Sequence, residues 1–527
     1  MPVKILSAAI FGLETEIVFV EADSGGGDFG QITIVGLPDT AVNESRERVK
    51  SALRHSGLEY PKRKITVNLA PADLRKSGPG YDLPITISVL ALVNELKINY
   101  QEDIFAGELS LEGELRPIKG VLAIALAAKK AGLKRFFLPA ENAAEALLLS
   151  ELEIVPVNNL SQLLDFLKGK IKIKTYKKIK ENLIVPEAFQ LSPEKTKLIE
   201  KNKIIKIDDN FDFSKIKGQE NAKRALEIMA AGGHNLLFSG PPGSGKTLLA
   251  KAAAKILPAL TEEECLEITK IYSISGKLKE SSLIKDRPFC APHHSASSAS
   301  LIGGGSSPHP GEISLAHLGL LFLDEFPEFN RGTIESLRQP LEEGKITISR
   351  AQGSFSFPAK FILLAAMNPC PCGYLGDKEK KCSCLERDIA RYQNKLSGPI
   401  LDRIDLFTEV KRLNINEIES DKEAEDSKEI KKRIEKARKK QEARYKDFSF
   451  KVNGEIPGTL IKEFCQLEKK ASEMLKNAFE KMALSNRSYF KILKIAKTIS
   501  DLDENQKTDI IKTKHLAEAL QYRRPEK

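Results

Sequence analysis

The sequence predicts an α/β protein in three parts: an α+β domain, a core built on a parallel sheet, and a helical C-terminal domain. Three observations lead to this expectation. A glycine-rich turn lies between an apolar run ending at Ser239 and a helical segment over 248–257. A second apolar run ends in the acidic pair Asp324-Glu325, as a buried parallel strand does at the carboxyl edge of its sheet. From about Asn414 the chain is rich in charge, and its apolar residues follow helical spacing.

Composition limits the classes of protein that fit. The 527 residues suggest about three or four domains, and 41% hydrophobic residues exclude a largely disordered or fibrous chain. The net charge of +10 favours a polyanionic partner, although a solvated lysine-rich surface explains it equally well. No apolar stretch approaches the ~20 residues of a spanning helix, so we expect no membrane partner. Seven cysteines, four of them close together, favour a reducing cytoplasm over a secreted disulfide framework.

The first 168 residues alternate short β-rich runs with helical runs, which predicts a compact α+β domain over 1–168. The stretch 169–210 is rich in lysine and isoleucine and has little periodicity, so it is predicted to be a linker. The α/β core is expected over 211–412 and the helical domain over 413–527. Within the first domain, the β-rich runs lie at 17–20, 32–35 and 64–69, and the helical runs at 40–56 and 117–131.

The glycine-rich turn matches a phosphate-binding loop. Its glycines allow backbone N–H groups to curl around phosphate oxygens, and the N-terminus of the following helix adds a positive dipole. Lys246 is expected to reach the β- and γ-phosphates, and Thr247 to offer its hydroxyl to Mg²⁺. The predicted ATP-binding residues are Gly240, Pro241, Pro242, Gly243, Ser244, Gly245, Lys246 and Thr247.

Further residues complete a hydrolytic site. Asp324 is expected to hold the Mg²⁺ shell, and Glu325 to orient the attacking water. The apolar strand over 361–367 ends at Asn368, whose amide can sense the γ-phosphate. Together with the phosphate-binding loop, these residues predict hydrolysis of ATP with Mg²⁺. Two later arginines, Arg403 and Arg487, form ordinary ion pairs as readily as catalytic contacts when they are judged from the residues alone.

Cysteines and histidines were weighed as metal ligands. A closed set of four thiolates is typical of structural Zn²⁺, although the C-x-C spacing here is tighter than the usual C-x₂-C. Free cysteines in a surface loop, or a redox-labile pair, are the alternative. We expect His293, His294 and His317 to pack or hydrogen-bond rather than to bind metal, because they lack carboxylates at ligand spacing. The predicted zinc ligands are Cys370, Cys372, Cys382 and Cys384.

The chain from residue 211 onward resembles the magnesium-chelatase-like branch of AAA+ ATPases, and the N-terminal part narrows the resemblance to the YifB/ComM group. The resemblance covers nearly the whole chain and thins in the linker and over 415–455. In the core and C-terminal domain it rests on the segments 287–294, 301–305, 310–317, 337–342, 366–373, 397–405 and 515–523. In the N-terminal part it rests on 35–39, 44–48, 65–75 and 107–116.

This resemblance implies roles that the residues alone left open. Arg403 would be an arginine finger reaching a neighbouring subunit's ATP, and Arg487 a sensor on a C-terminal helical lid. A finger supplied in trans requires a homo-oligomeric ring, a hexamer in this family. The implied activity is ATP-driven, helicase-like translocation on branched or single-stranded DNA, with branch migration during recombination in natural transformation. Lys345 and Arg350 of a predicted hairpin, and the segment 301–307, are candidate DNA contacts.

Two other functions remain open at this point. The first is a magnesium-chelatase-type motor subunit, against which the N-terminal domain argues. The second is a protein-remodelling or proteolytic ATPase. The N-terminal domain is similar to a Lon-type protease domain, but the nucleophile position falls on Gly80 and the lysine position on Leu122. Without a base beside a hydroxyl no acyl-enzyme forms, so peptidase activity is not expected, although nearby Ser77 and Lys119 make a shifted dyad conceivable. A scaffold, ring-stabilising or DNA-contacting role remains for this domain.

Overall fold

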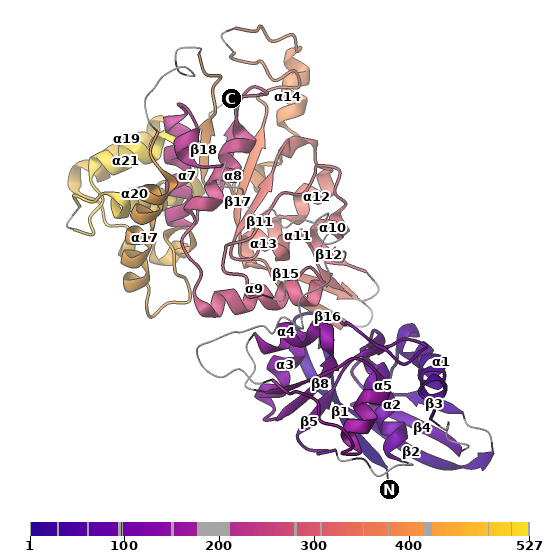
Figure 1. Cartoon of the computed structure of the whole chain (residues 1–527). Coiled ribbons are helices and arrows are strands. Elements are labelled where there is room, and N and C mark those ends of the chain that lie inside the picture. Colours follow the sequence, from indigo (N-terminus) through magenta and orange to yellow (C-terminus); the bar gives the residue numbers. More distant parts are fainter. Residues whose placement is uncertain are drawn as a thin grey trace.

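The chain forms an N-terminal sheet-based unit and a larger unit that combines a parallel sheet with a helical domain (Figure 1). The computed structural model describes residues 2–28, 31–58, 60, 63–92, 96, 98–148, 152–176, 211–278, 282–305, 308–350, 353–377, 379–414, 417, 424–482, 484–506 and 508–524. The predicted linker lies outside the described residues from 177 to 210. Its described beginning ends at Tyr176, which forms a β-bridge with Ile154.

The N-terminal unit is built on a seven-stranded mixed sheet with the order β3-β4-β2-β1-β5-β8-β9. The neighbours β1–β2 and β2–β4 are antiparallel, and the remaining pairs are parallel. All three β-rich runs predicted from the sequence lie in this sheet. Its strands are β1 Val3–Phe11, β2 Glu14–Asp28, β3 Ile32–Val35, β4 Arg63–Ala70, β5 Asp103–Phe105, β8 Arg135–Pro139 and β9 Glu153–Val157.

Helices cover this sheet and enclose two apolar cores. The side chain of Asp39 caps the first helix by accepting from Val42 N at 2.8 Å. The helix predicted over 117–131 begins only at Val121, because Gly120 before it adopts φ +75°. The helices are α1 Thr40–His55, α2 Asp82–Ala91, α3 Val121–Lys130, α4 Ala143–Leu147 and α5 Leu160–Leu167, with a small hairpin of β6 Glu108–Leu109 and β7 Leu115–Arg116.

The core carries a five-stranded sheet in which every neighbouring pair is parallel, with the order β11-β14-β17-β10-β18. Its central strands are continuous apolar runs, as expected for a parallel sheet that is covered on both faces. The order places the ends of β14, β17 and β10 next to one another. The strands are β11 Phe289–Cys290, β14 Leu320–Leu323, β17 Ile362–Met367, β10 Leu236–Ser239 and β18 Leu406–Glu409.

Around this sheet lie helices and two hairpins (Figure 1). The hairpins are β12 Gly303–Gly304 with β13 His309–Pro310, and β15 Lys345–Arg350 with β16 Gly353–Pro358. The helices of the core are α7 Glu220–Gly232, α8 Lys246–Ile256, α9 Glu262–Ser275, α10 Ser298–Ile302, α11 Glu312–Leu315, α12 Arg331–Ser336, α13 Arg338–Glu343, α14 Glu386–Gln393 and α15 Gly398–Leu401.

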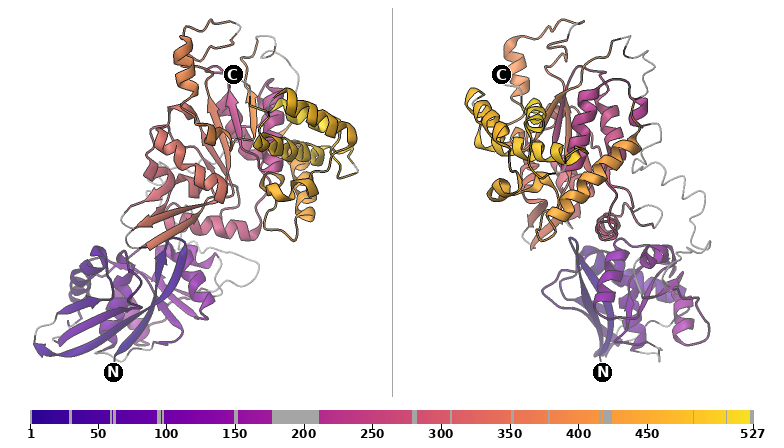
Figure 2. Two further views of the ribbon diagram at one scale, coloured as in Figure 1. Left: turned by 180° about the vertical axis from the view of Figure 1, so that it is seen from behind. Right: turned by 90° about the vertical axis from the view of Figure 1, so that its left-hand side faces the viewer.

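The C-terminal helices share one apolar core with the α7 and α8 side of the parallel sheet, and both views of Figure 2 show them against it. A buried hydrogen bond of 2.8 Å between His234 Nε2 and Thr498 Oγ1 joins the two parts. None of the helices in the described part of the chain is both long and apolar enough to cross a bilayer. These helices are α17 Ser427–Arg444, α18 Ile461–Phe464, α19 Lys469–Lys481, α20 Asn486–Leu502 and α21 Thr513–Gln521.

The N-terminal unit contacts the core through α3 and α9 (Figure 2). Gly120 N donates to the carbonyl of Ser273 at 3.1 Å, and Ser273 Oγ donates to Glu145 Oε1 at 2.5 Å. A second contact is the stacking of Phe11 on Phe355 of β16, with ring centroids 6.5 Å apart. The N-terminal unit therefore touches both a helix of the core and its longer hairpin.

Candidate functional site

The glycine-rich loop connects β10 to α8, in the strand–loop–helix setting predicted from the sequence. Gly243 and Gly245 adopt φ of +75° and +91°, which favour glycine. A Cβ on Gly240 would lie 2.1 Å from the carbonyl oxygen of Val410, so only glycine fits there. Because α8 begins directly at Lys246, the unpaired amide groups of its first turn lie beside the loop, where they can bind phosphate.

Three parallel strands bring the predicted polar residues together. Lys246 Nζ donates to the carbonyls of Gly240 at 2.7 Å and Pro241 at 2.9 Å, and to Asn368 Oδ1 at 3.2 Å. Thr247 Oγ1 donates to Asp324 Oδ2 at 2.6 Å. Burial lowers the pKa of Lys246, while the charge of Asp324 opposes that shift. Residues from β10, β14 and β17 thus form one cluster at the sheet edge.

Glu325 lies beside this cluster and contacts a residue that sequence reasoning placed elsewhere. Its backbone adopts φ +51°, and its Oε2 lies 3.1 Å from His294 Nδ1. His294 thus pairs with a carboxylate that lies 31 positions away in the sequence, which agrees with the expectation that it hydrogen-bonds. The sequence did not reveal this contact, because it depends on β11 and β14 being neighbours in the sheet. His294 follows β11 and Glu325 follows β14. His317 does hydrogen-bond, since its Nδ1 accepts from Lys360 N at 3.1 Å.

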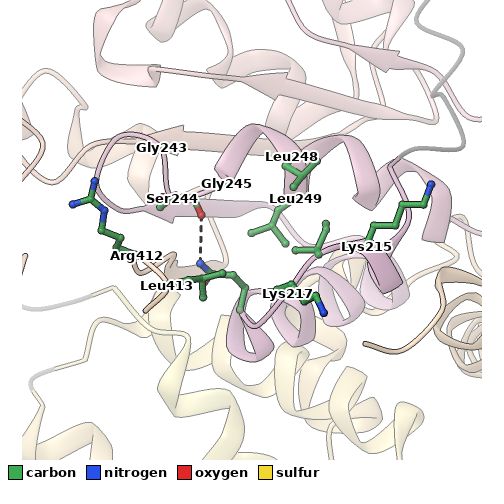
Figure 3. A pocket seen from close by; sticks show the side chains of 11 residues that line it. Lys215, Lys217, Gly243, Ser244, Gly245, Leu248, Leu249, Arg412 and Leu413 are labelled. Carbon is green, nitrogen blue, oxygen red and sulfur yellow. Dashed lines mark hydrogen bonds between the residues drawn. The ribbon is translucent and has the colours of Figure 1, made fainter. Parts of the chain in front are cut away.

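A pocket of about 290 Å³ opens beside the glycine-rich loop (Figure 3). Its apolar lining includes Ile216, Leu249 and Leu413. Gln219 Nε2 donates to the carbonyl of Ser244 at 3.3 Å and holds the loop against this pocket. The buried Ser244 Oγ has no hydrogen-bond partner among the described residues. An apolar slot with polar groups at one end suits a nucleotide base. The glycine-rich motif marked Gly243, Ser244 and Gly245 of its lining, but no motif marked its apolar residues.

The two arginines Arg403 and Arg487 lie together although 84 residues separate them in the sequence. Arg403 Nη2 donates to Glu342 Oε1 and its Nη1 to the carbonyl of Pro399. Arg487 Nη2 reaches the same Glu342 oxygen at 3.3 Å. Within the described chain, neither guanidinium hydrogen-bonds a residue of the glycine-rich loop. Sequence reasoning missed Glu342, which lies inside one of the resembling segments but carries no separate signal.

The four predicted zinc ligands lie together, with all four Sγ atoms within 4.8 Å of one another. The Sγ atoms of Cys370, Cys372 and Cys382 are 3.4–3.6 Å apart. These separations far exceed the ~2.05 Å of a disulfide and approach the ~3.8 Å edge of a ZnS₄ tetrahedron with ~2.3 Å bonds. The donor set therefore fits Zn²⁺.

The Lon-like positions of the N-terminal unit are occupied by packing residues. Gly80 lies in a short 3₁₀ turn, and a Cβ there would meet Ile118 Cδ1 at 3.6 Å. Leu122 is fully buried in α3, and its N–H donates to Glu145 Oε1 at 3.1 Å. The carbon chain of Lys119 lies over Gly276 of the core. Of the two positions, Leu122 therefore lies next to the docking surface, because Glu145 accepts from both Leu122 N and Ser273 Oγ of the core, whereas Gly80 packs on Ile118 within its own unit.

Comparisons with known proteins agree with this architecture. Family models match over residues 212–418 (magnesium chelatase, subunit ChlI), 20–142 (subunit ChlI of Mg-chelatase) and 424–523 (magnesium chelatase, subunit ChlI C-terminal). The chain is 40% identical to competence protein ComM of Haemophilus influenzae, covering 98% of this chain and 97% of that protein. It is also 40% identical to the uncharacterized protein YifB of Escherichia coli, covering 98% and 96%.

A shorter similarity links the chain to Lon protease of Clostridium beijerinckii, at 27% identity over 25% of this chain and 17% of that protein. This match agrees with the Lon-like character of the N-terminal domain. Together with the parallel sheet, the glycine-rich loop and the C-terminal helical domain, the full-length similarities confirm the resemblance stated from the sequence. The chain belongs to the ComM/YifB family of magnesium-chelatase-like AAA+ proteins.

Proposed function

We propose that this protein is an ATP-hydrolysing ring motor that translocates on DNA and moves branched junctions. The observation that carries the proposal is the cluster of Lys246, Thr247, Asp324 and Asn368, with Glu325 beside it, at one sheet edge. The DNA part of the proposal is supported by the similarity to a competence protein over nearly the full length of both chains. The net charge of +10 also favours a polyanionic partner.

Each residue of the cluster has a role that its position supports. Lys246 would neutralise the β- and γ-phosphates, and the loop amides would hold their oxygens. Thr247 and Asp324 would hold Mg²⁺, which supplies positive charge to the departing phosphates. Glu325 would accept the proton of the attacking water once its carboxylate is turned from His294. Asn368 is already hydrogen-bonded to Lys246. This bond would orient the Asn368 amide and the Lys246 ammonium group toward the γ-phosphate.

The arginines support a ring. Arg403 and Arg487 lie together, and within the described chain neither one hydrogen-bonds the glycine-rich loop of its own subunit. We therefore propose that they act on the ATP of an adjacent subunit in a homo-oligomer. The family leads us to expect a hexamer. Mixing two inactive variants tests this arrangement. Arg403→Ala supplies intact Lys246 and Glu325, while Glu325→Gln supplies an intact Arg403. Mixed rings should recover ATPase activity, whereas persistent inactivity in confirmed mixed rings would exclude an arginine acting in trans.

Steady-state ATPase measurement with no DNA, single-stranded DNA and a four-way junction tests the DNA proposal. We expect several-fold stimulation by DNA that declines as salt rises, because phosphate contacts release counterions. A rate indifferent to every DNA would exclude the translocase and favour a porphyrin or protein substrate, the two alternatives left open by the sequence.

The four-cysteine cluster is proposed as a structural zinc site. Closed four-thiolate shells bind Zn²⁺ tightly and leave no open position for catalysis. The site lies next to the nucleotide: Cys370 follows Asn368 by two residues, and Gly373 packs against Pro242 of the glycine-rich loop. We propose that zinc fixes this segment and thereby holds Asn368 in place. All seven cysteines are free thiols in the structure, which supports the proposed cytoplasmic location.

A further inference from the structure

Among the described residues, Glu342 is the carboxylate that contacts both arginines of the proposed finger and sensor pair, while Asp402 Oδ2 lies 3.9 Å from Arg487 Nη1 alone. Glu342 Oε1 accepts from Arg403 Nη2 and, at 3.3 Å, from Arg487 Nη2. The side chain of Glu342 is 49% exposed, whereas that of Arg403 is only 8% exposed. The finger residue is therefore folded back into its own subunit by a partner that lies at the surface.

Besides this ion pair, the guanidinium of Arg403 makes one further hydrogen bond among the described residues, from Nη1 to the carbonyl of Pro399. Its Nε is buried without a hydrogen-bond partner among the described residues. Burial lowers the pKa of Arg403, and the neighbouring cations Arg487 and Arg338 lower it further, against the attraction of Glu342. A buried and incompletely paired cation beside two other cations is stabilised by leaving the site. Loss of the Glu342 contact would therefore favour release of Arg403.

Glu342 is also tied to the longer hairpin of the core. It lies on α13, which ends at Glu343, and Gly344 follows with φ +64°. Gly344 N donates to the carbonyl of Pro340 in α13 at 3.0 Å, and Ala359 N, just after β16, donates to the Gly344 carbonyl at 2.8 Å. Gly344 thus joins α13 to the base of the β15–β16 hairpin, because its N–H bonds the helix and its carbonyl bonds the residue after β16. These bonds provide a path by which motion of the hairpin can be passed to α13.

We infer that Glu342 is a positioning residue through which the β15–β16 hairpin controls the two arginines. It holds Arg403 and Arg487 against their own subunit, and displacement of the hairpin moves α13 and releases them toward the ATP of the adjacent subunit. In the motor proposed above, on which this inference rests, DNA is the group that displaces the hairpin. The N-terminal unit contacts the same hairpin, because Phe11 stacks on Phe355 of β16.

Two matched variants test the inference. Glu342→Gln removes the charge that binds the arginines, and Glu343→Gln removes the same charge one residue later. Among the described residues, the side chain of Glu343 accepts a hydrogen bond from Gln339 on its own helix and from no other residue. Steady-state ATPase rates are measured with and without a four-way junction, and mass photometry and thermal unfolding confirm ring assembly and folding. We expect Glu342→Gln to raise the DNA-free rate several-fold and to reduce the stimulation ratio, with Glu343→Gln like the wild type.

A rise in the DNA-free rate is the result that a purely structural role of Glu342 would not produce, and adding Arg403→Ala should abolish this rise because the arginine finger is then missing. Should Glu342→Gln fail to fold, Glu342→Asp, which keeps the charge but shortens its reach, should give a smaller rise. A DNA-free rate equal to or below that of Glu343→Gln, in folded rings, would overturn the inference. Absence of DNA stimulation in the wild type would instead refute the translocase, while the DNA-free comparison would still test Glu342.

Discussion

The two sheet-based units of this protein differ in the residues that occupy their site positions: polar in the core, and apolar or glycine in the N-terminal unit. At the sheet edge of the core, β10, β14 and β17 are followed by polar residues that hydrogen-bond across the strands, among them Lys246 and Asp324. In the N-terminal unit, the positions that correspond to a Lon-type dyad hold Gly80, which packs on Ile118, and Leu122, which is buried in α3. Each unit keeps an apolar core. A fold therefore persists on packing alone, and chemistry must be argued from the site.

The largest effect should come from removing the proposed catalytic carboxylate of the core. Glu325→Gln should lower the ATPase rate about 10²–10⁴-fold, because a general base of this kind contributes that much. Affinity for a fluorescent ATP analogue should be retained. The control is Glu328→Gln, three residues later, whose carboxylate pairs with Lys395 at the surface. Equal rates for the two variants would show that the reaction uses another base.

A glycine substitution in each unit contrasts the two sites directly. Gly240→Ala places a Cβ 2.1 Å from the backbone oxygen of Val410, so ATP binding should be lost and the Tm should fall. Gly80→Ala meets only a side-chain carbon at 3.6 Å, so ATP binding and the Tm should be unchanged. Isothermal titration with ATP and thermal unfolding measure both. An ATP-binding defect in Gly80→Ala would contradict the view that the Lon-like position is structural.

Removing one cysteine tests the metal proposal. Cys382→Ser should reduce zinc from about one ion per chain to none, measured by elemental analysis. ATP affinity should also weaken, because the cysteine segment packs on Pro242. Cys465→Ala, a buried cysteine of the helical domain, should keep its zinc. A wild-type protein purified without chelator and free of zinc would exclude this site.

The smallest effect is expected at the docking surface between the units. Burial raises the pKa of Glu145, against the hydrogen bond from Ser273. A carboxyl group whose pKa is higher in the folded than in the unfolded protein destabilises the fold. This destabilisation grows as pH rises from the unfolded pKa to the folded pKa. Glu145→Gln keeps both hydrogen bonds without the charge, so its Tm should exceed that of the wild type by about 2 °C at pH 7.5 and match it near pH 4.5. A uniform loss of Tm at every pH would contradict this account.

The sequence was sufficient for the fold class and for the residues that follow strands in short motifs. Lys246 and Thr247 were predicted from the glycine-rich motif, and Asp324 and Asn368 because each lies directly after an apolar run. Parallel strands end at one edge of their sheet, which brings these residues together. His294 and Glu342 were missed, because their contacts depend on strand order and on a helix that lies far away in the sequence. The pocket beside the glycine-rich loop was missed for the same reason, since Ile216 and Leu413 come from opposite ends of the core.

Cysteine clustering was also predictable, because all four residues fall within 15 positions and a short loop must bring them near one another. The docking of α9 on α3 was not, since neither helix carries a distinctive pattern and their contact spans more than 140 residues. Clusters of residues that lie close in the sequence could thus be predicted from their spacing, whereas contacts between the units required the three-dimensional structure.

The most direct test of the central claim is the conversion of a labelled four-way junction into duplex products by the purified ring. We predict conversion with ATP and Mg²⁺ by the wild type and none by Glu325→Gln, with both proteins binding the junction to the same extent. Junctions that remain unchanged under conditions where the wild-type ring hydrolyses ATP would contradict the claim that hydrolysis drives movement on DNA.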